Sequence, residues 1–272
     1  MRTTIFLAIA LFSAAVVVHA AADEQTIVVC APGSPGSTEE AQPRMDAFAA
    51  AVGAKAGGSL AAVYEPTEAG GVKRFETAGI GIVSLPFFLA HEKDLGLHAR
   101  LEVVQKGRPA LERWTLVAQK GRVTKADSLA GMTIISSSGF APDFVRAAVA
   151  QLGTVPAGVK IVQASTVLSA LRRAAKGDPV AVLLDGPQAA SLPSLPFAAQ
   201  LESVTTSPAW PAGVVVTVDS KVKAWAPLQT ALLGMASDRA GATALEGLQT
   251  DHIAPLDDAA LASARKTFAR PQ

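Results

Sequence analysis

SLAGMTIISSSGFAPDFVRAAV, the segment from Ser128 to Val149, contains the pattern that decides the fold. It predicts a short buried strand over 132–135, then a turn of three serines and a glycine, and then an amphipathic helix that begins near Ala141. At such a turn the first helical N–H groups and several hydroxyls share one space, and the positive end of the helix dipole favours an anion there. The same serines also suit an ordinary helix cap without a ligand. The segment alone leaves both interpretations open.

The composition is that of a globular protein. The chain has 272 residues, enough for one large domain or two modest ones. Half of the residues are hydrophobic and 17% are charged, so the chain can bury a core and does not have a disordered composition. Cys30 is the single cysteine and cannot form an internal disulfide. We expect it to be a free, partly buried thiol at the end of a strand.

The N-terminus has the pattern of a cleaved signal peptide, which we expect to span residues 1–22. A short positive lead is followed by an apolar run over 5–18 and by Val18-His19-Ala20, which resembles a cleavage site. The apolar run is shorter than the roughly 18 residues expected of a membrane-spanning helix. Without the leader, basic and acidic residues balance, and no basic cluster suggests nucleic acid as a partner. The sequence therefore predicts an exported, periplasmic protein.

Short apolar strands alternate with helices along the rest of the chain. The expected strands are 26–30, 60–64, 80–83, 100–105, 112–119, 132–135, 159–162, 180–184, 201–205 and 214–218. The expected helices are 37–53, 69–77, 141–152, 166–175, 223–236, 239–249 and 258–268. This alternation predicts an α/β fold with largely parallel sheets. Two such units with a purely helical tail suggest a first domain that begins the chain and takes it back at the end. Residues 207–211, which contain two prolines, are expected to be an irregular crossing or hinge.

Two segments resemble the periplasmic phosphonate-binding proteins of ABC transporters. Residues 129–140 are similar to that family's "L-x-G-K, strand, S-x-S-G" segment. Residues 165–185 are similar to its next strand–helix–strand unit, which leads to "G-x-A-D-A" and an acidic residue. The resemblance covers most of the chain after the leader, and its motifs are shared by other type 2 periplasmic binding proteins. It implies two α/β lobes, each a mostly parallel sheet flanked by helices, with two crossing strands as the hinge.

The resemblance also implies a domain arrangement and a function. Lobe 1 would consist of 23–118 and 207–272, and lobe 2 of 119–206. A small-molecule ligand would bind in the cleft and close the lobes, and an ABC permease of the inner membrane would be the partner. We expect a monomer without a cofactor or a metal.

The resemblance assigns site residues at the ends of strands. Ser136, Ser137 and Ser138 would hold an oxyanion, and Asp185 would hold a cation, although Asp185 also suits an N-cap. Further candidates lie in the same turn or just past other strand ends, where open α/β sheets bind ligands. They are Gly139, Phe140, Tyr64, Ser84, Phe87, Ser34 and Ser165. The aromatic members of this set also suit core packing.

The chain departs from the family pattern in ways that leave the ligand class open. Met132 replaces a usual lysine, and no expected cleft position of lobe 1 supplies Arg or Lys. An anion would then depend on neutral donors. Alternatively, an apolar pocket for a lipid or sterol would be lined by five side chains: Leu85, Phe87, Phe88, Phe140 and Leu184.

Enzymatic function has little support in the sequence. The chain has no G-x-S-x-G elbow, and its Gly33–Thr38 segment lacks the lysine of a P-loop. Its histidines are scattered and match no metal-binding spacing. We therefore expect a binding protein of a transporter. A periplasmic sensor or partner module with the same fold is the second hypothesis.

Overall fold

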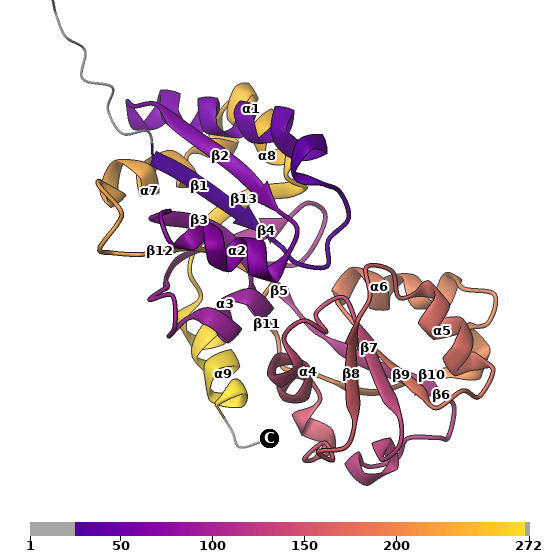
Figure 1. Ribbon diagram of the computed structural model, residues 1–272. Coiled ribbons are helices and arrows are strands. Elements are labelled where there is room, and N and C mark those ends of the chain that lie inside the picture. Colours follow the sequence, from indigo (N-terminus) through magenta and orange to yellow (C-terminus); the bar gives the residue numbers. More distant parts are fainter. Residues whose placement is uncertain (1–24, 270–272) are drawn as a thin grey trace, which may run out of the picture.

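The computed structural model describes residues 25–269 and arranges them in two lobes, each built on one sheet (Figure 1). The expected signal peptide, 1–22, lies outside the described residues. Within residues 25–269, no helix is both long and apolar enough to cross a membrane.

Lobe 1 contains a six-stranded sheet with the order β13-β4-β12-β3-β1-β2. Its strands are β1 (Gln25–Cys30), β2 (Leu60–Glu65), β3 (Ile80–Ser84), β4 (His98–Gln105), β12 (Gly213–Thr217) and β13 (Thr250–Pro255). β1 is parallel to β2 and β3, and β12 is antiparallel to both β3 and β4. The strands β1 to β4 therefore run in one direction, and their carboxyl ends point toward the second lobe (Figure 1).

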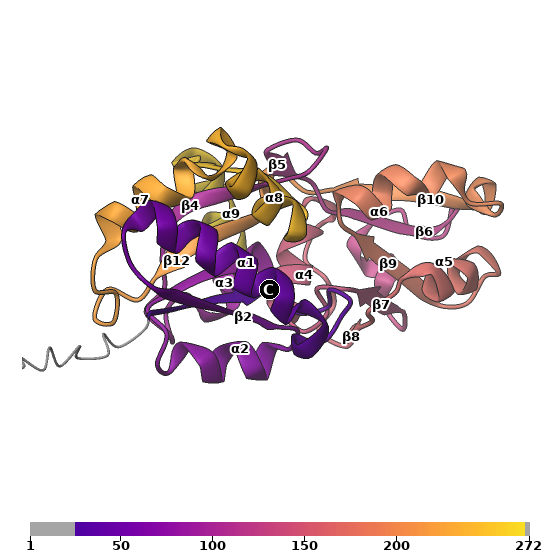
Figure 2. The same cartoon turned by 90° about the horizontal axis from the view of Figure 1, so that it is seen from above.

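Helices cover both faces of this sheet (Figure 2). α1 (Thr38–Ala56), α7 (Trp225–Leu233) and α8 (Arg239–Gly247) pack on one face, which contains buried Ile27, Ile80 and Leu101. α2 (Glu68–Phe75) and α3 (Leu85–His91) pack on the opposite face, against Val28 and Val83. The two faces follow from the period of two along each strand, because successive side chains point to opposite sides of a sheet.

Lobe 2 contains a five-stranded sheet with the order β10-β6-β9-β7-β8. Its strands are β6 (Thr115–Gln119), β7 (Thr133–Ser136), β8 (Lys160–Gln163), β9 (Val180–Leu184) and β10 (Leu201–Thr206). β7 is parallel to β8 and β9, β6 is antiparallel to β9 and β10, and four strands therefore share one direction. The helices of this lobe are α4 (Pro142–Ala148), α5 (Leu168–Ala175) and α6 (Gly186–Ser191). Short 3-10 turns are η1 (Ala126–Leu129), η2 (Ala150–Leu152), η3 (Leu192–Ser194), η4 (Ala198–Gln200) and, in lobe 1, η5 (Met235–Ser237).

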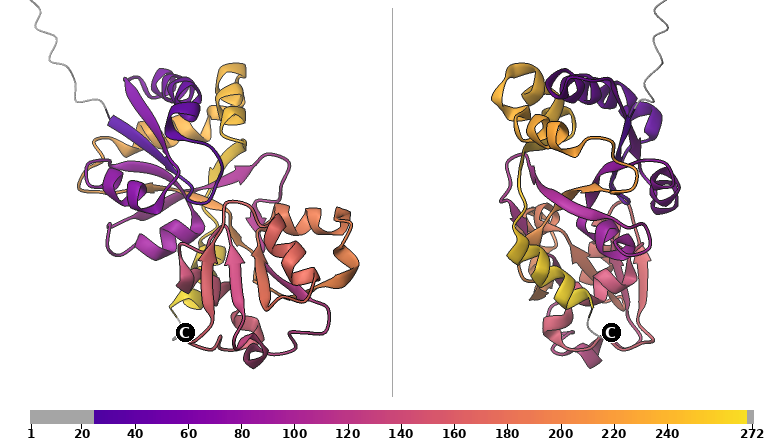
Figure 3. Two further views of the ribbon diagram at one scale, coloured as in Figure 1. Left: turned by 45° about the vertical axis from the view of Figure 1, so that its right-hand side comes forward. Right: turned by 90° about the vertical axis from the view of Figure 1, so that its left-hand side faces the viewer.

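The connection between the lobes is tightly packed. The outgoing and returning chains pair as a two-stranded ladder of β5 (Leu111–Glu112) and β11 (Trp210–Pro211). The rings of Trp114, Trp210 and Phe144 contact one another beside this ladder, with centroids 5.0–6.0 Å apart. α9 (Asp258–Phe268) runs alongside and contacts both β11 and α4 of lobe 2 (Figure 3). The hinge region is thus part of the hydrophobic core.

Several elements differ from the sequence-based expectation, among them the strand expected at 112–119, which is divided into β5 and β6. The C-terminal segment is not purely helical, because β13 lies between α8 and α9 and pairs with β4. Only Thr250 and Ile253 of β13 are buried, so the strand carries a weak apolar signal. The apolar run after β3, where no helix was expected, forms the buried helix α3, with Pro86 in its first turn, where a missing N–H costs nothing. Finally, Trp210–Pro211 belongs to a ladder and is not irregular.

Candidate functional site

A cavity of about 610 Å³ lies where the strand ends of the two lobes meet. Lobe 1 lines it with residues of the 29–37 segment that follows β1 and with the ends of β2, β3 and β4. Lobe 2 lines it with the serine turn after β7, with Ser165 after β8, and with the first turn of α6. The carboxyl ends of parallel strands are where open α/β sheets place ligands, and here two such edges face each other.

Seven of the expected site residues line this cavity: Ser34, Tyr64, Ser84, Ser137, Ser138, Ser165 and Asp185. The Ser84 hydroxyl is buried there without a hydrogen-bond partner. Among residues 25–269, the hydroxyls of Ser137 and Ser138 have no side-chain hydrogen bond either. The Ser84 hydroxyl is available to a ligand, because a buried polar group without a partner costs free energy until one is supplied. The Ser137 and Ser138 hydroxyls lie in the cavity lining and can also bind a ligand.

The remaining four expected residues do not line the cavity. The Ser136 hydroxyl donates to the carbonyl of Leu183 at 2.9 Å and accepts from the Ser138 N–H at 3.2 Å, so it shapes the serine turn. Gly139 lies against β8, where a Cβ would come within 2.5 Å of the Gln163 nitrogen. Phe87 is fully buried in the hydrophobic cluster that spans both lobes, and Phe140 packs against that cluster.

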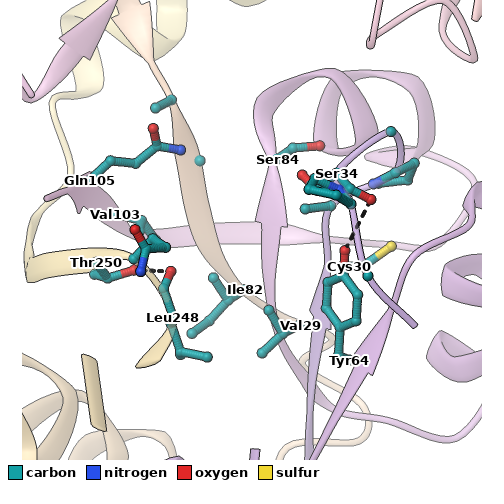
Figure 4. Close-up of a pocket in the computed structure, with 18 of the residues that line it drawn as sticks. Val29, Cys30, Ser34, Tyr64, Ile82, Ser84, Val103, Gln105, Leu248 and Thr250 are labelled. Carbon is teal, nitrogen blue, oxygen red and sulfur yellow. Dashed lines mark hydrogen bonds between the residues drawn. The ribbon is translucent and has the colours of Figure 1, made fainter. Parts of the chain in front are cut away.

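The side chains expected to form an apolar pocket are also core residues. Leu85, Phe87, Phe88 and Leu184 are fully buried in the two clusters under the sheets. None of them lines the cavity. Its apolar lining comes from other residues, among them Val29, Ile82, Val103 and Leu248 (Figure 4).

Basic side chains reach the cavity from lobe 1. Arg44 of α1, together with Lys106 and Arg108 of the turn between β4 and β5, lines it. The expectation that no cleft position of lobe 1 supplies Arg or Lys is therefore wrong. The sequence could have indicated Lys106 and Arg108, because both residues follow the end of an expected strand. Arg44 lies in a helix, seven residues past its cap, so the rule that ligands bind at the ends of strands does not predict it.

Two carboxylates lie together at the base of the cavity. Glu112 of β5 accepts a hydrogen bond of 2.8 Å from the Gly186 N–H, and Asp185 caps α6 by accepting one of 2.8 Å from the Gln188 N–H. Burial, with a smaller contribution from the charge of Asp185, raises the pKa of Glu112 to about 7, although the Gly186 N–H and Arg108 oppose the shift. Burial also raises the pKa of Asp185, against the Gln188 N–H and Arg108. In the described part of the chain, neither carboxylate has a Lys or Arg partner at ion-pair distance.

The lobes touch across the cavity at Gly33. This residue has φ +86°, and a Cβ there would lie 2.3 Å from the carbonyl oxygen of Ser137 in lobe 2. Only glycine allows this backbone approach, both for space and for the left-handed conformation. The Tyr64 hydroxyl lies 3.5 Å from the Ser34 carbonyl oxygen and supports the same loop (Figure 4). The cavity is therefore closed at this side by two loops in contact.

Neither a metal site nor a reactive thiol is formed by the described residues. No three His, Cys, Asp or Glu side chains between 25 and 269 are placed to hold a metal ion. Cys30 is buried, and desolvation together with the nearby Glu65 and Glu68 raises its pKa far above the usual range. A thiol in such surroundings stays protonated and unreactive.

Sequence comparisons find no relative, whereas structural comparisons find many. No protein-family model matches the chain, and no curated protein matches it. A binding-protein component of a Pseudomonas aeruginosa ABC phosphonate transporter superposes with a TM-score of 0.63 at 17% identity, over 90% of this chain and 86% of that one. PhnD1 of Prochlorococcus marinus, in complex with methylphosphonate, gives 0.59 at 10% identity, over 89% and 97%. A Xanthomonas citri protein bound to ATP gives 0.66 at 14%, over 90% and 96%.

At these identities the similarity shows the fold. The α/β class and the two-lobed architecture of type 2 periplasmic binding proteins, both expected from the sequence, are confirmed. The resemblance of the chain to phosphonate-binding proteins is confirmed at the level of the fold as well.

Proposed function

We propose that this protein is the periplasmic substrate-binding component of an ABC transporter and that it captures a small organic oxyanion, of the phosphonate type, between its lobes. The observation that carries the proposal is the convergence of hydroxyl-bearing turns from both lobes on one cavity. Similarity in fold to a phosphonate-transporter component and to a methylphosphonate complex supports it. An inner-membrane ABC permease is the proposed partner, and a monomer is the proposed state.

The oxyanion would be held by donors from both sides of the cavity. Ser137 and Ser138 approach it from lobe 2, and Ser34 and Ser84 from lobe 1. Hydrogen bonds to a charged group contribute roughly 1.5–3 kcal/mol each, about twice the contribution of neutral ones. Because the donors belong to different lobes, the ligand bonds to all of them only while the lobes are together. Ligand binding would therefore stabilise the closed form.

The acidic side of the cavity has a separate role in the proposal. We assign Asp185, with Glu112 beside it, to a cationic group of the ligand, such as an amine. Both carboxylates line the cavity without an ion-pair partner among residues 25–269. The cap that Asp185 provides for α6 uses one of its oxygens and leaves the other for a ligand.

Calorimetry on the mature protein with methylphosphonate tests the oxyanion site. The double variant Ser137→Ala/Ser138→Ala is expected to bind methylphosphonate at least about 10-fold more weakly, because one or two hydrogen bonds to the charged head are lost, at roughly 1.5–3 kcal/mol each. Ser203→Ala is the matched control, since Ser203 is exposed on β10 and does not line the cavity. The control is expected to bind like the wild type.

Two results would contradict the proposal. One is wild-type protein that binds none of methylphosphonate, phosphite, sulfate or a small sulfonate. The other is equal loss of affinity in the double variant and in Ser203→Ala, which would show that the serine turn has no particular role. A thermal-shift measurement with each ligand distinguishes lost binding from a variant that has failed to fold.

A further inference from the structure

The cavity extends from the inter-lobe gap onto the sheet of lobe 1. Tyr64, Val29 and Ile82 lie side by side in one row across β2, β1 and β3, because Val29 is in register with both neighbours. All three line the cavity, together with Val103 of β4 and Leu248, which follows α8. In Figure 4, Val29 and Ile82 lie between Tyr64 on one side and Leu248 on the other. The apolar strip consists of these five residues: Tyr64, Val29, Ile82, Val103 and Leu248.

The helices above the sheet leave Val29, Ile82 and Leu248 of this strip only partly buried, while Tyr64 and Val103 are buried in the same cluster. Ile27 and Ile80 lie on the same face, two residues earlier in their strands, and are fully buried in the cluster beneath α1, α7 and α8. Val29 and Ile82 are only partly buried, although they have the same orientation. A sheet face is ordinarily covered to the strand ends by the layer packed on it. Here Val29 and Ile82, near the ends of their strands, are left partly open to the cavity.

The strip separates two polar regions of the cavity. Ser34 and Ser84 lie at its Tyr64 side, where the serine turn of lobe 2 also approaches, and Gln105 and Thr250 lie at its Leu248 side (Figure 4). The volume of about 610 Å³ falls within the roughly 300–1,000 Å³ of pockets that enclose drug-sized ligands. A methylphosphonate-sized anion at the serine turn would leave the strip uncovered.

We propose that the ligand is an amphiphilic organic oxyanion, with its anionic head at the serine turn and an apolar body of several carbons on the apolar strip. The inference rests on the proposed function, because the strip alone does not specify a head group. It deepens that function by naming the ligand class. Removing apolar surface from water is the source of the added affinity, and it contributes about 0.8 kcal/mol for each buried methylene.

A series of alkylphosphonates with one head group and increasing chain length tests the proposal. Calorimetry with methyl-, butyl- and octylphosphonate is expected to show a roughly fourfold gain in affinity for each added methylene that the strip can cover. Val29→Thr keeps the shape of the side chain and replaces one methyl of the strip with a hydroxyl. It is expected to weaken octylphosphonate binding by about fivefold or more, and methylphosphonate binding by less. Val162→Thr is the matched control, because Val162 is a strand valine, 45% exposed, outside the cavity.

A second pair of variants tests the strip at a position outside the sheet, so that its result does not depend on a change within a strand. Leu248→Ser alters the strip at a loop position, and Leu233→Ser alters an exposed leucine of α7, 38% exposed, away from the cavity. Only Leu248→Ser is expected to reduce the chain-length gain. Equal affinity of the wild type for the three phosphonates would overturn the inference and leave the proposed function standing. Failure of all three phosphonates to bind would overturn the inference, and failure of phosphite, sulfate and a small sulfonate as well would overturn the proposed function with it.

Discussion

Glu112 is the residue whose surroundings are least expected from the sequence. It lies in the two-residue strand that leads out of lobe 1, yet its carboxylate is bonded to the first turn of α6 in lobe 2. A Cβ at Gly186 would lie 3.2 Å from that carboxylate, so the glycine allows the approach. The side chain thus links the outgoing chain to lobe 2 by a hydrogen bond, and it does so as a partly buried acid.

Replacing this acid should change the pH dependence of stability. The folded protein raises the pKa of Glu112 from 4.5 to about 7, so between these values the folded chain keeps a proton that the unfolded chain releases. This contribution to the free energy of unfolding is fully present below pH 4.5 and is lost as pH rises through 7. Its upper limit is about 3 kcal/mol. Glu112→Gln keeps a side-chain oxygen that accepts from the Gly186 N–H, and it should remove this pH dependence of the free energy of unfolding. The stability of the variant relative to the wild type should therefore rise with pH.

Chemical denaturation at pH 5, 6, 7 and 8 measures the effect. Glu76→Gln serves as the control, because Glu76 is exposed at the end of α2 and its replacement also removes one negative charge. If the wild type and Glu112→Gln lose stability in parallel over this range, Glu112 is not the group that titrates.

Part of the candidate site was predictable from single residues, and part was not. The strand-end rule placed Ser84, Tyr64 and Asp185 at the cavity, because parallel strands expose their carboxyl-terminal side chains at one edge. Glu112 was missed because it reads as part of a longer strand, and only the tertiary fold shows that β5 belongs to the hinge. Phe87 was misplaced because the same rule cannot distinguish a strand end that opens to a cavity from one that leads into a buried helix.

At the scale of elements, α9 is the segment that joins the lobes by packing. Its buried face carries Ala260, Leu261 and Ala264, and the helix contacts both α4 and β11. Arg265 pairs with Glu92, which follows α3, and lies over the Phe88 ring at 5.4 Å from its centroid. A helix held in this way makes residues 258–268 part of the hinge core.

The substitution Leu261→Ala should therefore be costly. The side chain is 1% exposed within the cluster that spans both lobes, and truncating such a leucine costs about 2–5 kcal/mol. Leu233→Ala, at an exposed leucine of α7, should cost less than about 1 kcal/mol. Denaturant unfolding at one pH compares the two. Equal midpoints would mean that α9 contributes little to the hinge core.

The predictability of elements followed the strength of their patterns. α1 was readable because Ser37 and Glu40 form a capping box, and the structure contains both of its hydrogen bonds. β13 could not be predicted in the same way. Its pairing with β4 contains a bulge between Thr250 and His252, and its apolar and polar residues alternate poorly. Edge strands of this kind form because a neighbouring strand offers them hydrogen bonds, and a single sequence does not contain that information.

At the scale of the whole molecule, the two lobes share one core. One hydrophobic cluster includes Val28 and Phe87 of lobe 1, Ile134 and Phe144 of lobe 2, and Trp210 between them. The expected lobe boundaries at 118/119 and 206/207 stay predictions. Motion about the hinge must preserve this cluster, so we expect the lobes to separate at the opposite side of the cavity, where Gly33 meets Ser137.

Gly33 gives the most direct test of closure. Alanine there would place its Cβ 2.3 Å from the Ser137 backbone oxygen, and a backbone atom cannot move aside as a flexible side chain can. Gly36, in the same loop, is the matched control, because it also has a positive φ, +105°, but its nearest neighbour would be 3.8 Å away, a carboxylate oxygen of its own lobe. Both variants incur the cost of a left-handed alanine, about 1–2 kcal/mol. Only Gly33→Ala should also hold the lobes apart.

Small-angle X-ray scattering is expected to show a larger radius of gyration for Gly33→Ala alone. Calorimetry is expected to show a weaker affinity of this variant for methylphosphonate, since the donors of the two lobes no longer reach one ligand. A Gly33→Ala protein as compact as Gly36→Ala, with the same affinity, would show that this contact does not determine closure.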